Sequence, residues 1–448
     1  MRLATVLVGL ACLAAVASSF RRRHSKTISK RLQRNREVNP EPSMVGETRI
    51  TQLLDHFDAS NTQTWQQRYF FNTQHKLSNV NILLLKGEET LHVEQITEDS
   101  PVLDYAKKFG AAVYMVEHRF YGESKPTPQT SKSSLKYLTS QQALADFVTF
   151  IKDVNSKSSE PQKWIAYGGS YAGNLALWLR QKYPDMVLGA VGSSAPVKAQ
   201  VDFYGFLKVV EEDIRISDKQ HNRTNLTCAN QIQLAFASVI ENMQSIDGRE
   251  RLDDLFSVDP PLSNYTTLDE NVIANFYSGL LEIFMDSAEN GGLTDGLTIP
   301  DICNMMILPD EDPLSLLDLV ELYNGPVYPD YDYWLNYYGD ETWSNRSNDR
   351  AWLWQSCNEF GYFQTTDYGS SIFGSTMPNN ANLNLCKDVF GIDTLTLEKN
   401  VQATNDFYGG PDYYTGTNVL ITYGSQDPWR FLMKKTSQHE SVAIAIVQ

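Results

Sequence analysis

The sequence predicts an α/β protein in which a parallel sheet carries a second, mostly helical lobe. Apolar runs of strand length alternate with helical stretches between residues 80 and 197, a pattern that favours parallel strands joined by right-handed crossovers. From about residue 202 the periodicity becomes helical, and strand character returns only at 418–423. The chain of 448 residues also exceeds the roughly 250–300 residues that one hydrophobic core serves.

The chain begins with a leader typical of secreted proteins. Met1-Arg2 precedes an apolar run and a small-residue cleavage site, which predicts a signal peptide over residues 1–17, too short to span a membrane. Residues 18–45 form a basic segment, with eight Lys/Arg and no acid between positions 21 and 36. This composition favours a solvated, disordered leader, and the alternative is a removable pro-segment or basic arm.

The body of the chain is acidic. Without Arg2, those eight basic residues and Glu37, residues 38–448 hold 29 basic and 53 acidic side chains, a formal charge of −24. This charge disfavours binding to nucleic acid or to anionic membranes, and no second apolar run is long enough to cross a bilayer. We therefore expect a soluble product of the secretory pathway, in a lysosomal or endosomal compartment or outside the cell.

The expected elements follow one another in a simple order. We expect strands at 80–85, 111–117, 164–167 and 186–191, and helices at 103–109, 141–152 and from residue 175 onward. Helical segments at 231–243, 270–287 and 314–323 lead to two last strands at 418–423 and 441–447. This order predicts the first part of a core over residues 46–200, a helical cap domain inserted over 201–400, and the last strands of the core over 401–448.

The turn after the strand at 164–167 carries the main catalytic signal. It reads GGSYAG at 168–173, close to the G-x-S-x-G pattern that exposes a serine at the carboxyl edge of a sheet. Ala172 stands where the pattern has glycine, and an N-cap serine is the structural alternative. We interpret this turn as the nucleophile elbow of an α/β-hydrolase, with Ser170 as the nucleophile and the Tyr171 N–H as an oxyanion donor.

A second signal follows the strand at 418–423. In an α/β-hydrolase the chain order is serine, then an acid after a late strand, then histidine after the last strand. Asp427 lies directly after this strand, which predicts that it is the acid of a catalytic triad. The structural alternative is a turn aspartate before Pro428.

The cysteines and glycosylation sequons also indicate secretion. Four cysteines remain after the signal peptide, and an even number in an oxidising compartment predicts two disulfides. Of the three pairings, we expect Cys228–Cys303 and Cys357–Cys386 because each joins a local segment. Four N-x-[ST] sequons predict glycosylated surface loops, at Asn222, Asn225, Asn264 and Asn345.

Ordered motifs across most of the chain resemble one peptidase family. They include LDHF at 54–57, EHRFYGES at 117–124, GGSYAG at 168–173, SAPV at 194–197, EFGY at 359–362 and DPW at 427–429. The chain resembles the serine carboxypeptidase family that contains lysosomal Pro-X carboxypeptidase, dipeptidyl peptidase 2 and thymus-specific serine protease, and it most resembles the last. The resemblance implies an α/β-hydrolase core with a helical cap and hydrolysis of short peptides, often beside proline.

Two departures from the family pattern bear on the substrate site. Residues 86–89 read KGEE where family members resemble Gly-Gly-Glu-Gly, so the Tyr171 N–H is the one oxyanion donor that we expect. Asn174 stands four residues past Ser170, where prolyl-cleaving relatives resemble methionine. This leaves a preference for proline open, although Trp429 offers a flat wall for a proline ring.

The third departure concerns the catalytic base. The histidines are His24, His56, His75, His92, His118, His221 and His439. We expect His56 and His118, in N-terminal motifs, to be structural. Only His439 follows Asp427, yet it precedes the final strand, whereas the resemblance places the base after that strand. We therefore expect the chain to be truncated at Gln448, before its catalytic histidine, with His439 on the surface.

The sequence thus predicts a serine-type exopeptidase that acts through a Ser-Asp-His triad and an acyl-enzyme, with no metal or cofactor. Its expected partners are short peptides, which Asn174 and Trp429 contact, and not nucleic acid or membranes. One alternative is a catalytically dead hydrolase-fold binding protein, because no base is identified. The other is an esterase or lipase, which the peptidase motifs outside the elbow disfavour. The end of the peptide that is cleaved and the presence of a homodimer stay open.

Overall fold

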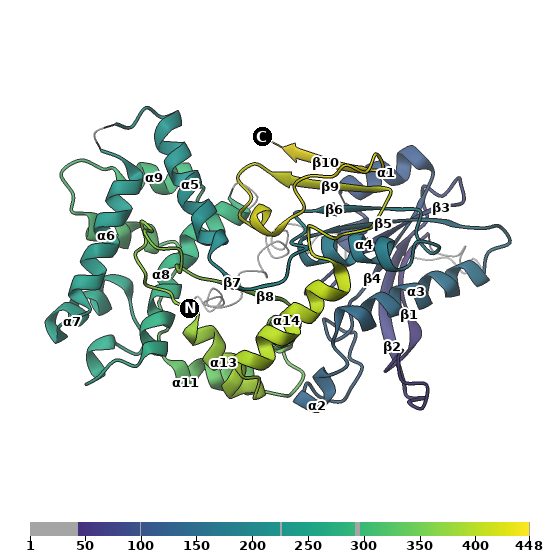
Figure 1. The fold of residues 1–448 in the computed structure, drawn as a ribbon, viewed down its shortest axis with the longest axis horizontal. Coiled ribbons are helices and arrows are strands. Elements are labelled where there is room, and N and C mark those ends of the chain that lie inside the picture. Colours follow the sequence, from purple (N-terminus) through teal and green to yellow (C-terminus); the bar gives the residue numbers. More distant parts are fainter. Residues whose placement is uncertain (1–43, 99, 225, 292–295, 448) are drawn as a thin grey trace, which may run out of the picture.

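The computed structural model describes residues 44–98, 100–224, 226–291 and 296–447. Two lobes are visible: a sheet with helices packed on it, and a group of helices beside it (Figure 1). The predicted signal peptide, all but two residues of the basic leader, and Asn225 lie outside the described residues.

An eight-stranded mixed sheet forms the first lobe, in the order β1-β2-β4-β3-β5-β6-β9-β10. The first three of these strands pair antiparallel, and all the other neighbours are parallel. The strands are β1 (Val45–Leu53), β2 (Thr64–Asn72), β3 (Val80–Leu85), β4 (Ala112–Val116), β5 (Lys163–Gly169), β6 (Gly189–Ser193), β9 (Val419–Gly424) and β10 (Val442–Val447).

Most of the strands predicted from the sequence are present, with two differences. The strand expected at 186–191 begins only at Gly189, because the Met186 and Val187 amides donate hydrogen bonds back to the Tyr183 carbonyl and form a turn. The antiparallel pair β1 and β2 was not expected. These strands mix polar and apolar side chains on both faces, so they lack the continuous apolar run that marks a buried parallel strand.

Helices cover both faces of this sheet because side chains of a strand alternate between its faces. In β3, Leu83 and Leu85 belong to the same core as α3 and α4, whereas Ile82 and Leu84 belong to a smaller core with α1. The helices of this lobe are α1 (Pro101–Phe109), α2 (Lys132–Leu135), α3 (Ser140–Ser156) and α4 (Ser170–Lys182), with the short turn η1 (Val93–Ile96).

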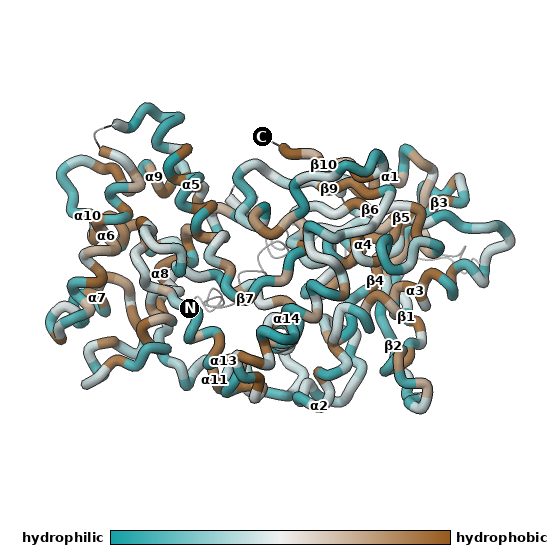
Figure 2. Tube along the Cα trace, viewed as in Figure 1, coloured by the Kyte–Doolittle hydropathy of each residue, from teal (hydrophilic) through white to brown (hydrophobic). Residues whose placement is uncertain are grey.

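The second lobe is helical around a two-stranded parallel sheet of β7 (Gln200–Phe203) and β8 (Gly361–Gln364). Its longer helices, with the connecting α14, are α5 (Gly205–Gln220), α6 (Cys228–Asn242), α7 (Ile246–Phe256), α8 (Glu270–Asn290), α9 (Ile299–Met306), α10 (Pro313–Glu321), α11 (Tyr331–Gly339), α12 (Ser347–Gln355), α13 (Asn380–Phe390) and α14 (Thr394–Tyr408). Three short turns are η2 (Leu262–Asn264), η3 (Ser356–Phe360) and η4 (Pro428–Leu432). The largest core cluster continues from the sheet into this lobe, and hydrophobic segments occur in both (Figure 2).

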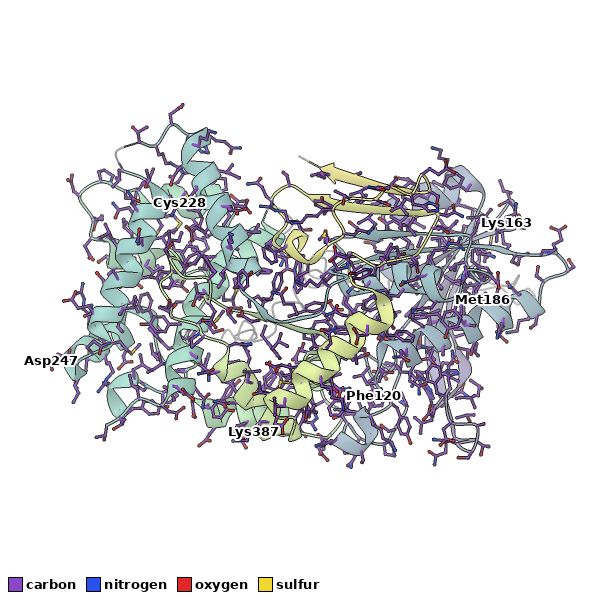
Figure 3. The ribbon with its side chains drawn as sticks, in the orientation of Figure 1. Phe120, Lys163, Met186, Cys228, Asp247 and Lys387 are labelled. Carbon is purple, nitrogen blue, oxygen red and sulfur yellow. A yellow bond between two sulfur atoms is a disulfide. The ribbon has the colours of Figure 1, made fainter. Side chains whose placement is uncertain are left out.

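Two disulfides cross-link segments of the helical lobe, and both have the predicted pairing. Cys228–Cys303 joins α6 to α9, and Cys357–Cys386 joins η3 to α13. Cys228 lies in the helical lobe, whereas Lys163 and Met186 lie at the far side of the sheet lobe (Figure 3). Disulfides of this kind persist in oxidising compartments, which is consistent with the secretory pathway.

Candidate active site

Ser170 lies at the sharp turn between β5 and α4, as predicted. Its backbone has a φ of 54°, a left-handed conformation that is uncommon and strained for a residue with a side chain. The turn closes only because its neighbours are small: a Cβ atom at Gly168 would lie 2.1 Å from the Ala172 carbonyl oxygen. The Ser170 hydroxyl is buried and has no hydrogen-bond partner.

Asp427 lies just after β9, at the start of η4. Its Oδ1 accepts a hydrogen bond of 2.9 Å from the Trp429 backbone N–H, and its Oδ2 is buried without a partner. Burial raises the pKa of this carboxyl, against the lowering effect of a hydrogen bond from Ser194. The negative form of Asp427 is therefore incompletely stabilised by the residues around it.

Three neighbouring strand ends bring these residues to one edge of the sheet. β5, β6 and β9 are adjacent and parallel, and Ser170, Ser194 and Asp427 follow their carboxyl ends. Ser194 was not predicted as a site residue, although it opens the SAPV motif at 194–197. Ser170 and Asp427 thus stand at the positions that the nucleophile and the acid have in α/β-hydrolases.

None of the described histidines bonds to the unpartnered atoms of Ser170 and Asp427. His118 is buried, with Nδ1 2.8 Å from the Arg119 carbonyl and Nε2 3.1 Å from the Tyr171 hydroxyl. Burial lowers its pKa to about 4, so His118 is neutral and donates from Nδ1 to the carbonyl. His439 is exposed in the loop before β10, and its Nδ1 lies 2.9 Å from the Ser441 hydroxyl.

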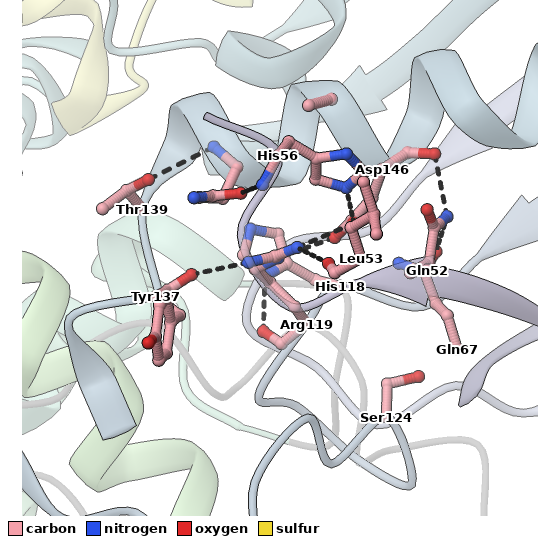
Figure 4. A network of polar contacts seen from close by, with 12 residues as sticks. Gln52, Leu53, His56, Gln67, His118, Arg119, Ser124, Tyr137, Thr139 and Asp146 are labelled. Atoms are coloured by element: carbon pink, nitrogen blue, oxygen red, sulfur yellow. Dashed lines mark hydrogen bonds and ion pairs between the residues drawn. The ribbon is translucent and has the colours of Figure 1, made fainter. Parts of the chain in front are cut away.

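A polar network behind the elbow contains residues of the N-terminal motifs, including His56 and Arg119 (Figure 4). Arg119 donates two hydrogen bonds to the Asp146 carboxylate, at 2.7 and 2.8 Å, and its other N–H groups reach the carbonyls of residues 53, 54 and 137. His56 Nε2 lies 2.7 Å from Asp146 Oδ1. His56 therefore belongs to this network and has no contact with the elbow serine.

Tyr171 provides the first backbone N–H after Ser170, and its ring is buried and held by hydrogen bonds to its hydroxyl. The Tyr171 hydroxyl accepts a hydrogen bond of 3.0 Å from Gln355 and lies beside His118. The loop after β3 packs on this ring, because a Cβ atom at Gly87 would lie 2.8 Å from Tyr171 Cδ1. This loop therefore lies on the side from which a second oxyanion donor comes in this fold.

Trp429 and Asn174 lie in one aromatic cluster beside the catalytic residues. Trp429 is 2% exposed and contacts the rings of Phe203 and Tyr362, with centroids 5.2 and 5.5 Å apart. Its indole N–H donates a hydrogen bond of 3.0 Å to Glu289 of α8. Asn174 is fully buried and bonds to Tyr362. Tyr362 belongs to the EFGY motif, whereas no sequence signal identified Glu289.

Several carboxyl groups near the site are protonated more readily than usual. Burial raises the pKa of Glu289 and of Glu88 to about 8, and negative neighbours, including Asp427 for Glu289, raise them further. Burial also raises the pKa of Asp213 to about 7, although Arg430 and Gln426 act against it. The net negative charge of this region therefore decreases as the pH falls below 8.

The described residues hold no group of three or more His, Cys, Asp or Glu side chains that could bind a metal ion. No helix within them is both long and apolar enough for a membrane span. The sequon residues Asn222, Asn264 and Asn345 are all exposed.

Comparisons with known proteins agree with the geometry of the elbow. The family model described as Serine carboxypeptidase S28 matches residues 52–448. A Caenorhabditis elegans protein whose name assigns it provisionally to the serine proteases is 37% identical, over 86% of this chain and 74% of that one. The human thymus-specific serine protease is 31% identical over 86% of this chain and 76% of its own length. The human lysosomal Pro-X carboxypeptidase is 29% identical over 84% of this chain and 76% of its own length.

Proposed function

Because the chain belongs to the serine carboxypeptidase S28 family, we propose that it is an exopeptidase that hydrolyses short peptides with Ser170 as the nucleophile. One observation carries this proposal: Ser170 Oγ and Asp427 Oδ2 are both buried and unpartnered, at the carboxyl ends of β5 and β9, which flank β6. Most buried polar atoms in proteins are hydrogen-bonded. A serine and an acid that each have an unpartnered buried oxygen at these positions are therefore available to a base between them.

The reaction follows from these positions. A base takes the proton of Ser170, whose oxygen attacks the peptide carbonyl carbon, while the Tyr171 N–H at the start of α4 binds the developing oxyanion. The protonated base then donates its proton to the departing amine, which leaves an acyl ester on Ser170. Water, deprotonated by the same base, hydrolyses this ester. Asp427 accepts the second N–H of the base and stabilises its charged form.

The strand order disfavours His439 as the base. β10 pairs parallel to β9, so its carboxyl end lies at the same edge of the sheet as Asp427. His439 precedes β10, and its neighbour Ser441 bonds to residues 418 and 419, at the opposite end of β9. A six-residue strand separates its ends by roughly 15–20 Å. We therefore propose that the base acts at the edge of the sheet that carries Asp427 and is not His439.

A fluorophosphonate probe tests this assignment because it labels only an activated serine. We expect His439→Ala to leave the labelling of the protein unchanged and Ser170→Ala to abolish it. Labelling that is lost in His439→Ala would instead make His439 the base.

We further propose a glycosylated product in endolysosomes or outside the cell. The two disulfides, the exposed sequon residues and the relative named as lysosomal support this location. Treatment of the expressed protein with an N-glycosidase should increase its gel mobility. An unchanged mobility would contradict the proposal.

A further inference from the structure

Asn174 combines full burial with an unsatisfied oxygen next to the nucleophile. It is 0% exposed, and its Oδ1 has no hydrogen-bond partner. Asn174 follows Ser170 by four residues in α4, so it lies about one helical turn, roughly 6 Å along the axis, from the serine. A group attached to the acyl carbon at Ser170 is therefore within reach of the Asn174 amide.

The orientation of this amide is fixed by its neighbours. Asn174 Nδ2 donates hydrogen bonds to the Pro196 carbonyl at 3.1 Å and to the Tyr362 hydroxyl at 3.2 Å. The Tyr362 hydroxyl in turn donates to the same Pro196 carbonyl. Because this carbonyl only accepts hydrogen bonds, a rotated amide would place two acceptors against each other. The oxygen must therefore be the atom that is left without a partner.

The groups around this amide are largely aromatic. The Tyr362 ring meets Trp429 edge to face, with centroids 5.5 Å apart, and stacks on Phe360 at 5.6 Å. Trp429 in turn follows Asp427 by two residues and contacts Phe203. Asn174 thus bonds to an aromatic cluster that extends to the residue after Pro428, and its free oxygen is a neutral hydrogen-bond acceptor.

We infer that Asn174 selects peptides whose residue on the acyl side of the cleaved bond carries a neutral hydrogen-bond donor, such as the hydroxyl of threonine or serine. This inference rests on the proposed role of Ser170, which places that residue beside Asn174. A donor from the substrate satisfies the buried oxygen, whereas a proline ring or an alkyl side chain leaves it unpaired. A charged side chain loses its hydration among the aromatic rings.

Tripeptides test this preference without knowledge of the cleaved end. In Ala-Xaa-Ala, removal of the last residue and release of the first two residues break the same bond, so Xaa is the acyl-side residue in both cases. Threonine and valine have nearly the same shape and differ in one hydroxyl. The Kd values of Ala-Thr-Ala, Ala-Val-Ala and Ala-Pro-Ala are measured by calorimetry with the Ser170→Ala protein, in which no turnover occurs.

We expect Ala-Thr-Ala to bind about tenfold more tightly than Ala-Val-Ala, and more tightly than Ala-Pro-Ala, as one additional buried hydrogen bond predicts. In the near-isosteric Asn174→Leu variant of the same protein the threonine-to-valine ratio should fall to about one. The matched control is Asn382→Leu, since Asn382 is also a buried asparagine with an unpartnered oxygen but lies on α13. This control should keep the ratio.

Equal affinity for the threonine and valine peptides would overturn the inference, and so would preferred binding of Ala-Pro-Ala or an unchanged ratio in Asn174→Leu. If Asn174→Leu fails to fold, the threonine-to-valine ratio of the unsubstituted pocket still decides. Binding and catalysis are separable here. A tenfold ratio in a protein that resists fluorophosphonate labelling would support this inference and contradict the proposed hydrolase.

Discussion

Two groups of buried polar side chains lie on opposite sides of the nucleophile elbow, and they differ in how their hydrogen bonds are met. Behind the elbow, Arg119 and Asp146 bond to each other twice, and His56 adds a further bond. In front of it, Ser170 Oγ, Asp427 Oδ2 and Asn174 Oδ1 have no partner. Unsatisfied buried atoms are costly, so we interpret these three atoms as groups kept for a base and a substrate. The first group also has one unpartnered atom, Gln52 Oε1, but its charged side chains are paired.

The two groups also differ in their electrostatics. Burial acts to raise the pKa of Asp146, but the charge and hydrogen bonds of Arg119, with those of His56, lower it overall. For Asp427 burial prevails, and the pKa is raised. A paired carboxylate serves the fold, whereas an incompletely paired one can still stabilise a positive charge that forms during a reaction.

The largest effect is expected for Asp427→Asn, which removes the charge in front of the elbow but keeps its shape. If Asp427 holds the base, kcat of the protein should fall by about 10⁴-fold. Its unfolding free energy should stay nearly constant, because the lost charge had few partners. Peptide hydrolysis and urea unfolding of the same preparation measure both quantities. A fall in activity of less than tenfold would contradict the assignment of the acid.

The same substitution behind the elbow, Asp146→Asn, should give the opposite pattern. It leaves the Arg119 guanidinium buried without a counter-charge, which costs about 3–5 kcal/mol of unfolding free energy. Urea unfolding of this variant beside Asp427→Asn provides a matched pair. If Asp427→Asn is the more destabilising of the two, the contrast between the two sides of the elbow is wrong.

A smaller effect is expected from pH. The folded protein holds protons on Glu88 and Glu289 up to a pH of about 8, whereas these groups lose them near the ordinary glutamate pKa of 4.5 when unfolded. Their stabilising effect is therefore fully present below pH 4.5 and is lost as the pH rises through 8. His118 acts in the opposite direction, but only between its folded pKa of about 4 and the ordinary histidine pKa of 6.5.

Between pH 6.5 and 8.5 the midpoint of thermal unfolding should consequently decrease, by roughly 1–3 °C for each of these two carboxyl groups. Glu289→Gln should flatten this dependence, and the exposed Glu94 provides the control variant Glu94→Gln, which should not. Differential scanning fluorimetry across this range measures the slope. A midpoint that rises with pH in this window would show that other groups dominate.

Much of the fold and half of the site could be predicted because the signals are local. The small residues within 168–173 indicate a tight turn that larger residues would not allow. The apolar runs of β3, β5 and β9 indicate strands of a buried parallel sheet. The disulfide pairing was predicted because each bridge joins two cysteines that are consecutive along the mature chain. In contrast, β1 and β2 escaped prediction because their partner is another strand and not an apolar environment that the sequence displays.

The sequence by itself located the turn at Ser170, predicted Asp427 as the acid and identified the family of the chain, since each depends on residues that are neighbours along the chain. Only the tertiary structure decided which distant side chains meet them. Glu289 reaches Trp429 across 140 residues, and Tyr362 reaches Asn174 across 188. Such contacts depend on how the helical lobe packs against the sheet. The hydrogen bonds that are met and those that remain open therefore become visible only once the whole chain is folded.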